Sequence, residues 1–418
     1  MTLILPKSRQ DAPTVRPSQD VPTIGFSQNS IWQTIVDRTP LGWLQLKKSK
    51  SRLIVAVAGI AFADLLMFAQ LGIQAALFDS NTMLNRSMDA DIIIGSAQYR
   101  DLNLGNTLPR RRLYQIKAIP GVESAEPLYV STVVWKNPQT RRKTQLTLVG
   151  QSLDRPAFTL NEINQNLDKL KQPDTFLFDR LSRGAYADVV AKVTAGQSVK
   201  TEVQRRTIEV IGLFSLGASF TTEGTLITSP ETFLRFFPDR SAGQITLGLI
   251  KVKPGVDPDR VLAQIKAILP PDTTASTKQQ YVSDEETYWQ QTTPLGIVFT
   301  FGTVMSFVVG MVIVFQILST DVNEHMSEYA TFKAMGYRDR YLLAIVLEQS
   351  LILASLGFIP GLALALGQYT IVRNLGALPI AMTVERLVLV FSLTVVMCVV
   401  LGAVATRKLQ SADPADNF

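Results

Sequence analysis

Four long apolar stretches constrain this chain more than any other feature, because each is long enough to cross a lipid bilayer. They cover residues 53–78, 295–318, 341–372 and 387–406, and a transmembrane helix needs about 20 apolar residues. Residues 79–294, between the first two stretches, are polar and mixed in composition. A charge-poor run with basic flanks is typical of a membrane span rather than of a soluble core helix. We therefore predict four transmembrane helices with one large domain inserted after the first.

Basic residues close to the span ends predict the orientation of the spans. Those before the first span and after the fourth are Lys47, Lys48, Lys50, Arg52, Arg407 and Lys408. Positive residues are enriched on the cytoplasmic side, so we expect both termini in the cytoplasm of an inner-membrane protein and residues 79–294 in the periplasm. Arg373 and Arg386 bound the short outer turn 373–386 and oppose this orientation, but the first span usually dominates.

The segments outside the spans differ in character. Residues 1–30 are rich in Pro, Ser and Gln without an apolar period, which is typical of a disordered tail. Residues 31–52 combine Trp, Leu and Lys as an amphipathic interfacial helix does, although an extended linker is the alternative. Residues 319–340 form a loop on the cytoplasmic side, and residues 407–418 form a cytoplasmic tail.

The large domain has an α/β pattern that occurs twice. In the first half, strands are expected near Asp91–Ile94, Ser131–Trp135 and Gln145–Val149, with a helix over Pro109–Ile119. Near its end the order is a strand at Ile245–Val252, a helix at Asp257–Leu269 and a strand at Thr273–Thr277. A β-rich, glycine-containing segment separates the two halves. The pattern predicts a split βαβ subdomain with a mostly β insertion, which by itself does not identify a function.

The composition argues against several classes of function. Cys398 is the only cysteine and His325 the only histidine, so multi-ligand Cys/His metal sites and histidine-based triads are excluded as predictions. The net charge of +6 is spread partly over membrane ends, which favours a topological role over nucleic-acid binding. No GxxxxGK[ST] phosphate loop is present, since Gly196–Thr201 lacks the required spacing. We expect no catalytic, cofactor or metal site on this chain.

Polar residues inside the spans are candidate functional residues. Asp64 lies twelve positions after Arg52, which places it near mid-membrane at ~1.5 Å per residue. A charge at that depth is costly, so Asp64 is expected either to couple protons or contact substrate, or to link helices through a residue such as Gln316 or Glu348. Gln70, Gln74 and Glu348 are expected in packed or interfacial surroundings.

Several motifs resemble the permeases of the macrolide-exporter type, also called type VII ABC transporters. They are LGWLQLKKSKSRLIVAVAGIAF at Leu41–Phe62, GVESAEPLY at Gly121–Tyr129, EYATFKAMGY at Glu328–Tyr337 and ADPAD at Ala412–Asp416. More narrowly, five segments resemble the DevC-type permeases of cyanobacterial DevBCA-type exporters. They are WKNPQTRR at Trp135–Arg142, QNLDKLKQPD at Gln165–Asp174, LFDR at Leu177–Arg180, GLFSLGASF at Gly212–Phe220 and TDVNEHMSEYATFKAMGY at Thr320–Tyr337. The resemblance runs from about Leu41 to the C-terminus.

The resemblance implies the permease subunit of a tripartite ATP-driven efflux pump. It implies a homodimer, a separate DevA-like ATP-binding subunit that holds ATP and Mg, a DevB-like periplasmic membrane-fusion adaptor and a TolC-like outer-membrane channel. It also implies mechanotransmission: ATPase closure would move the spans and the periplasmic domain, and cargo such as glycolipid would be driven outward. The alternatives are an FtsX-like permease that controls a cell-wall hydrolase, and a lipoprotein-releasing permease.

The resemblance places the ATPase contact in the loop 319–340. On a helix there, Glu328, Phe332 and Met335 share one face by their i, i+4, i+7 spacing. Lys333 lies on the same helix, and Gly336 is well placed to end it. An aromatic ring and a flexible methionine beside an acid suit a partner's groove.

Possible adaptor contacts are the basic residues of the large domain and one tryptophan. They are Arg110, Arg111, Arg112, Trp135, Arg141 and Arg142. Basic clusters are usually solvated surface, which is the alternative for the five arginines.

Overall fold

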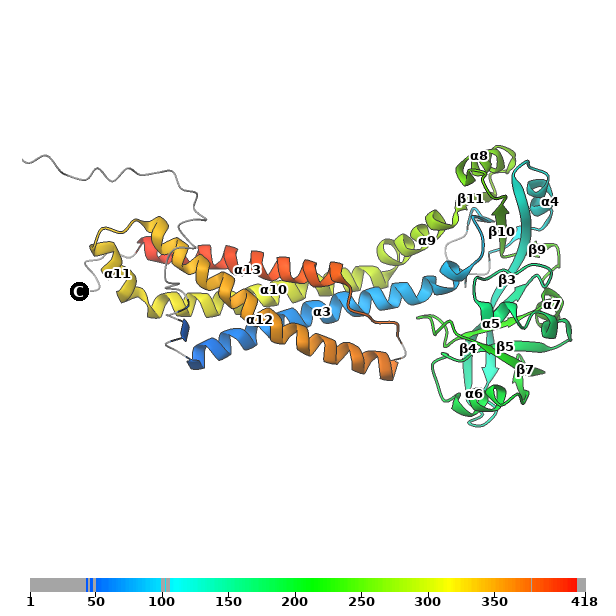
Figure 1. The fold of residues 1–418 in the computed structure, drawn as a ribbon, viewed down its shortest axis with the longest axis horizontal. Helices are drawn as coiled ribbons and strands as arrows, with labels where there is room; N and C mark the ends of the chain where they lie inside the picture. Colours follow the sequence, from blue (N-terminus) through cyan, green and yellow to red (C-terminus); the bar gives the residue numbers. More distant parts are fainter. Residues whose placement is uncertain are drawn as a thin grey trace, which may run out of the picture.

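The structure is a computed structural model of the chain. It describes Trp43, residues 46–47, 50–98, Leu102, 106–376 and 378–411. The predicted tail 1–30, most of the predicted interfacial segment 31–52 and the ADPAD sequence at 412–416 lie outside the described residues. A long helical bundle carries a sheet-rich domain at one end (Figure 1).

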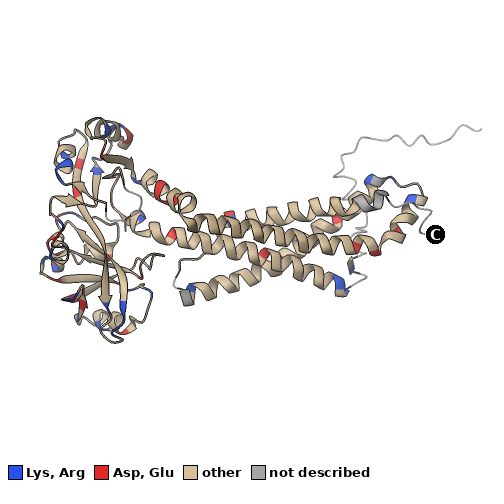
Figure 2. Cartoon of the chain, turned by 180° about the vertical axis from the view of Figure 1, so that it is seen from behind, with Lys and Arg blue, Asp and Glu red and all other residues tan. Residues whose placement is uncertain are grey.

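The four apolar stretches of the sequence each lie in one helix of the bundle. These helices are α3 (Lys50–Ser87), α10 (Pro294–Glu324), α12 (Asp339–Gly376) and α13 (Val384–Ser411). All four of these helices are long and apolar enough to cross a membrane. Charged residues are sparse along the bundle and gather on the large domain and at the bundle's other end (Figure 2).

Helix α3 is longer than its apolar stretch and continues into the large domain. The apolar run ends at Phe78, but the helix continues to Ser87 through polar residues. Beside this extension lies α9 (Lys278–Thr287), which leads through a π-helical turn (Tyr288–Thr292) into α10. Together, residues 79–87 of α3 and helix α9 form what we call the stalk. Hydropathy could not reveal it, because its residues are mostly polar.

Small residues let the helices of the bundle approach α3 closely. A Cβ added to Gly361 of α12 would lie 2.8 Å from Asp64 Cβ and 3.1 Å from the Ala61 carbonyl oxygen, both on α3. Gly357, one turn earlier, would meet Ile60 at 2.5 Å. Helices in membranes pack closely where small residues face each other. Pro360 lies inside α12, which continues through it.

The large domain contains a nine-stranded sheet whose first and last segments come together. Strands β1 (Ile92–Ser96) and β3 (Val122–Lys136) pair with β10 (Leu247–Val252), and β1 also pairs with β11 (Thr273–Thr277). The accompanying helices and the small two-stranded sheet are α4 (Arg111–Lys117), α8 (Pro258–Ile268), β2 (Leu108–Pro109) and β9 (Gln244–Ile245).

The mostly β segment between the two α/β halves closes into a barrel with the C-terminal part of β3. The strand order β3-β4-β8-β5-β7-β6 returns to β3, because Trp135 pairs with Val203. The new strands are β4 (Lys143–Gln151), β5 (Thr175–Asp179), β6 (Val199–Val203), β7 (Arg206–Phe214) and β8 (Thr225–Thr228). The short helices are α5 (Asn161–Asn164), η2 (Asp168–Lys171), α6 (Ala187–Thr194) and α7 (Pro230–Phe236).

The close contact between α3 and α12 gives a testable prediction. Gly361→Ala forces the two helices apart, because its new Cβ has no room against Asp64 and Ala61. We expect a loss of about 1–3 kcal/mol in stability, measured as a lower melting temperature in lipid nanodiscs.

Gly367→Ala is the matched control, because it lies in the same helix and a Cβ there meets nothing within 4 Å. It should leave the melting temperature unchanged or raise it, since Ala favours a helix over Gly by up to ~1 kcal/mol. Equal melting temperatures for the two variants would contradict the packing described.

Candidate functional site

The loop between α10 and α12 folds into a short helix at the end of the bundle opposite the large domain. This helix is α11 (Met326–Ala334), and Tyr329 fixes it to the bundle with only 1% of its surface exposed. Burial, with Asp321 and Glu328 nearby, raises the pKa of the Tyr329 hydroxyl. His325 begins α11, and its Nδ1 lies 3.0 Å from the Asp321 carbonyl oxygen. Helix α11 is therefore fixed to the bundle at its start and along its inner face.

The predicted face of Glu328, Phe332 and Met335 is only partly exposed. Phe332 is half-buried and packs against the bundle core, with its ring 5.7 Å from Tyr337 and 6.2 Å from Tyr341. Phe332 therefore does not project freely from α11, and its contact with a partner stays a prediction. Its ring turns inward because three aromatic rings can cover one another there.

The residues after α11 form the exposed part of this site. Gly336 has a φ of +89°, its N–H donates to Lys333 O, and the N–H of Tyr337 donates to Phe332 O. This pair of bonds is a Schellman motif, which requires a residue such as glycine in the left-handed conformation. The turn holds Met335 and Tyr337 outward, with 59% and 44% of their surfaces exposed.

Asp64 links α3 to α13 at mid-span. Its side chain is fully buried, and Thr394 Oγ1 donates to its Oδ1 at 2.5 Å. Among the described residues, its Oδ2 has no hydrogen-bond partner. The sequence predicted Gln316 or Glu348 as the residue linked to Asp64. Thr394 could not be recognised as its partner from the sequence, because threonine is common in apolar helices.

The other polar residues of the spans occupy different surroundings. Gln70 Nε2 donates to Phe299 O at 3.1 Å and so joins α3 to α10 near the stalk. Gln74 and Glu348 are half-buried. The bundle's end opposite the domain is also tied together, because Arg52 of α3 pairs with Glu324 of α10.

The two halves of the stalk are joined by a cluster of polar contacts. Asn85 Nδ2 donates to Glu285 Oε2 at 2.5 Å, with both side chains buried. Arg86 bridges Asp79 of its own helix and Glu286 of α9. Thr82 Oγ1 lies 3.5 Å from Glu286 Oε1. These residues were missed by sequence reasoning, since the spacing between residues 79–87 and 278–287 carries no motif.

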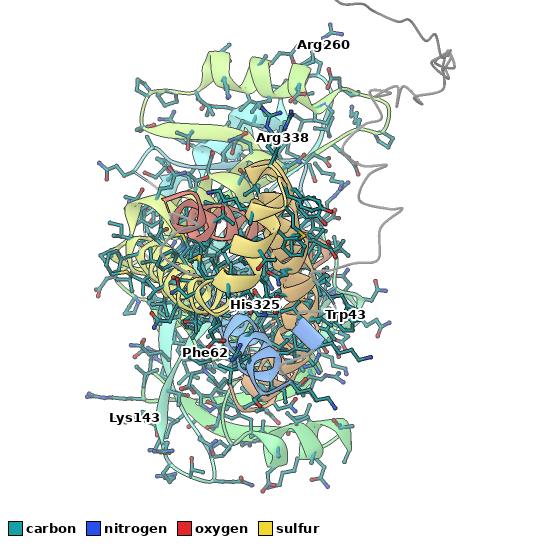
Figure 3. The ribbon with its side chains drawn as sticks, turned by 90° about the vertical axis from the view of Figure 1, so that its left-hand side faces the viewer. Trp43, Phe62, Lys143, Arg260, His325 and Arg338 are labelled. Atoms are coloured by element: carbon teal, nitrogen blue, oxygen red, sulfur yellow. The ribbon has the colours of Figure 1, made fainter. Side chains whose placement is uncertain are left out.

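The two basic clusters of the large domain lie far apart. Arg141 and Arg142 are exposed in the hairpin 137–142 between β3 and β4. Lys143, next to this hairpin, lies at the end of the domain opposite Arg260 of α8 (Figure 3), and α4, with the other cluster, lies on the α8 side (Figure 1). The six candidates therefore cannot form one patch.

Within each cluster the exposure also differs. Arg111 is exposed, but Arg110 and Arg112 are half-buried, and Arg112 lies 3.6 Å from Asp272. Trp135 is fully buried, with ring-centroid distances of 5.1 Å to Phe178 and 6.5 Å to Tyr186. Trp135 is thus a core residue, and the expectation that it contacts a partner is wrong.

The hairpin that carries Arg141 and Arg142 is held rigidly. Asn137 Oδ1 accepts from the backbone N–H groups of Gln139 and Thr140, and its Nδ2 donates to Ala185 O at 2.9 Å. Local side-chain bonds of this kind are what favour Asn in turns.

No cluster of three or more potential metal ligands occurs in the part of the chain that the structure describes.

A protein-family model matches the C-terminal part of the chain. Residues 300–414 match the family model described as FtsX-like permease C-terminal. This region comprises most of α10 and all of α11, α12 and α13, and so includes the exposed turn after α11. A comparison with curated proteins gives no match.

Three solved structures are similar to part of the chain. The periplasmic region of MacB from Actinobacillus actinomycetemcomitans has 12% identity and a TM-score of 0.32, covering 47% of this chain and 92% of that one. The extracellular domain of the ABC-type transporter YknZ from Gram-positive bacteria has 11% identity and a TM-score of 0.28, covering 45% and 100%. A domain of a putative permease protein from Porphyromonas gingivalis has 15% identity and a TM-score of 0.27, covering 45% and 88%. TM-scores this low do not establish a common fold.

The buried contact in the stalk can be tested with a matched pair of variants. Asn85→Asp places a carboxylate against Glu285, replaces a donor with an acceptor, and should weaken the stalk by about 1–3 kcal/mol. We expect faster amide hydrogen exchange in residues 79–87 and 278–287.

Asn81→Asp is the control, because Asn81 Oδ1 already accepts a bond from Phe220 N and a carboxylate can accept the same bond. It should leave exchange in the stalk unchanged. Unchanged exchange in Asn85→Asp as well would show that the 2.5 Å contact does not hold the stalk together.

Proposed function

We propose that this chain is the permease subunit of a type VII ABC exporter and acts as a mechanical link. The FtsX-like region supports this class, and the continuous helix α3 is the observation that carries the mechanism. A single helix of 38 residues runs from the bundle end near α11 to the large domain. A displacement at one end of so long a helix must reach the other, because its backbone hydrogen bonds are uninterrupted.

In this proposal a separate ATPase subunit, of the DevA type, holds ATP and Mg and binds the turn after α11. Met335 and Tyr337 offer exposed apolar surface, and Phe332 and Tyr329 transmit force to the bundle core. Glu328 and Lys333 are half-buried and would border the contact. Both termini would be cytoplasmic and the large domain periplasmic, as the basic residues at the span ends predict.

The chain would act as a homodimer within a tripartite pump of the DevBCA type. A DevB-like adaptor would sit on the periplasmic domain, with a TolC-like channel beyond it, and lipophilic cargo such as glycolipid would be driven outward. The rigid basic hairpin at Arg141 and Arg142 is the stronger candidate for the adaptor contact, because both guanidinium groups are exposed. In the other cluster only Arg111 has that exposure.

The assembly itself is tested by affinity purification of the tagged chain from native membranes, followed by mass spectrometry. An ATPase together with a periplasmic adaptor is the expected result. An ATPase with a cell-wall hydrolase or its activator, and no adaptor, would contradict export and favour an FtsX-like signalling permease.

A charge in the exposed turn should disrupt the ATPase contact. In Met335→Asp, a carboxylate replaces an apolar side chain that is 59% exposed, so an apolar groove on the partner would have to desolvate it. We expect at least a roughly tenfold loss of co-purified ATPase, equivalent to about 1.4 kcal/mol.

Tyr114→Asp serves as the control, because Tyr114 is 65% exposed on α4 of the large domain. It should retain the ATPase. If Met335→Asp retained it to the same extent, the turn after α11 would not be the docking site.

Charge reversal of the hairpin should weaken adaptor binding. The double variant Arg141→Glu and Arg142→Glu is expected to reduce co-purified adaptor and to make the remaining binding less sensitive to salt, since screened surface charges steer such contacts. Arg111→Glu is the comparison on the other cluster. If Arg111→Glu alone reduced the co-purified adaptor, the adaptor contact would be assigned to α4 instead.

A further inference from the structure

Two exposed apolar side chains lie together at one end of the barrel. Leu181 follows β5 and is 53% exposed, and Phe220 follows β7 and is 37% exposed. The strands β5 and β7 are parallel and end level with each other, because Asp179 pairs with Phe214. We call residues 180–184 and 215–224 the barrel-end loops. Residues 214–222 contain no charged side chain.

Asp179 fixes the barrel-end loops to each other. Its carboxylate is fully buried and accepts from three backbone N–H groups, those of Leu181 at 3.0 Å, Leu216 at 3.1 Å and Gly217 at 2.8 Å. Burial raises the pKa of this carboxyl, and the three donors oppose that shift. Gly217 adopts a φ of +114°, which glycine tolerates. Leu181 and Phe220 are therefore held on a rigid base.

The barrel-end loops lie beside the part of α3 that directly follows the end of its apolar run. The N–H of Phe220 donates to Asn81 Oδ1 at 3.2 Å, and a Cβ at Gly217 would lie 3.2 Å from Met83 Cε. Asn81 is three residues past Phe78, the last residue of the apolar run, which corresponds to ~4.5 Å along the helix.

The orientation of the barrel also places Phe220 on the side of the large domain that faces the bundle. Helix α7 follows β8 directly and lies at the far side of the large domain from the bundle (Figure 1). The loop that precedes β8 must therefore lie at the near side, toward the bundle. Phe220 is on that loop.

Other side chains at this level are of the kind found at membrane surfaces. Glu286 contacts Thr82, so Tyr288 and Trp289, which follow it toward the bundle, lie beside the end of the apolar run of α3. Arg180 and Arg183 lie on either side of Leu181, and the Arg180 side chain is 40% exposed while it pairs with Glu162 at 3.0 Å. Aromatic and basic residues are enriched where a protein meets the headgroup region.

We propose that Leu181 and Phe220 insert into the leaflet that faces the large domain, so that the barrel rests on the bilayer surface. The large domain is then in contact with the membrane at two places: through the stalk and through the barrel-end loops. A bilayer fits these loops better than a soluble protein does, because their apolar tips lie beside the spans of their own chain. The inference does not depend on which partners the chain has.

Depth-dependent fluorescence quenching in lipid nanodiscs tests this contact. Cys398→Ala removes the only cysteine, and Phe220→Cys or Leu181→Cys then carries an environment-sensitive thiol probe. Nanodiscs are prepared with lipids brominated near the headgroup end of the acyl chains. Variants are used if their melting temperature matches that of the parent.

Two further sites calibrate the measurement. Ile297→Cys lies at the domain end of α10 with 63% of its surface exposed and marks a lipid-facing position near the headgroups, and Tyr114→Cys marks a position far from the membrane. We expect quenching at Phe220 and Leu181 to approach that at Ile297 and to exceed that at Tyr114 several-fold. Quenching no greater than at Tyr114 would overturn the proposal. So would formation of a disulfide-linked dimer by unlabelled Phe220→Cys together with no quenching of the labelled protein, because a second copy would then cover the loop.

Discussion

The unbroken backbone of α3 is the constraint on which the rest of the structure depends. One helix, Lys50–Ser87, crosses the bundle and enters the large domain, so neither part can move along its axis without the other. A flexible linker at Phe78 would have separated the two. The extension is stabilised by its contacts with α9 rather than by its own sequence, since its polar residues would not hold a helix of two turns alone.

The remaining helices restrict how α3 can move. Gly357 and Gly361 bring α12 against it, and Thr394 of α13 bonds to Asp64 at mid-span. At the end opposite the domain, Arg52 joins α3 to Glu324, close to where α11 begins. In the proposed mechanism, movements of α11 would reach α3 mainly through the packed side chains of α10 and α12, since the Arg52–Glu324 pair is largely exposed. Asp64 is then better explained as a link between helices than as a proton carrier.

The sequence predicted the elements that depend on hydropathy and punctuation. The four apolar helices, the helix ended by Gly336 and the strands at Ile245–Val252 and Thr273–Thr277 all have strong local signals. What could not be predicted depends on contacts between distant segments. The stalk requires residues 79–87 to meet residues 278–287, and the barrel requires Trp135 to pair with Val203. Phe332 and Trp135 were placed on the surface because an aromatic residue in a polar segment looks like a contact residue, and only the fold shows which rings cover each other.

If α3 is the mechanical link, nucleotide-driven movement at the bundle end reaches the large domain through this helix. Hydrogen exchange of the complex with its ATPase tests this most directly, by comparing the nucleotide-free state with a state trapped by a non-hydrolysable ATP analogue. Transmission through α3 should change exchange together in α11, in the stalk and in the barrel-end loops. A change confined to α11, with the stalk and the large domain unaltered, would contradict it.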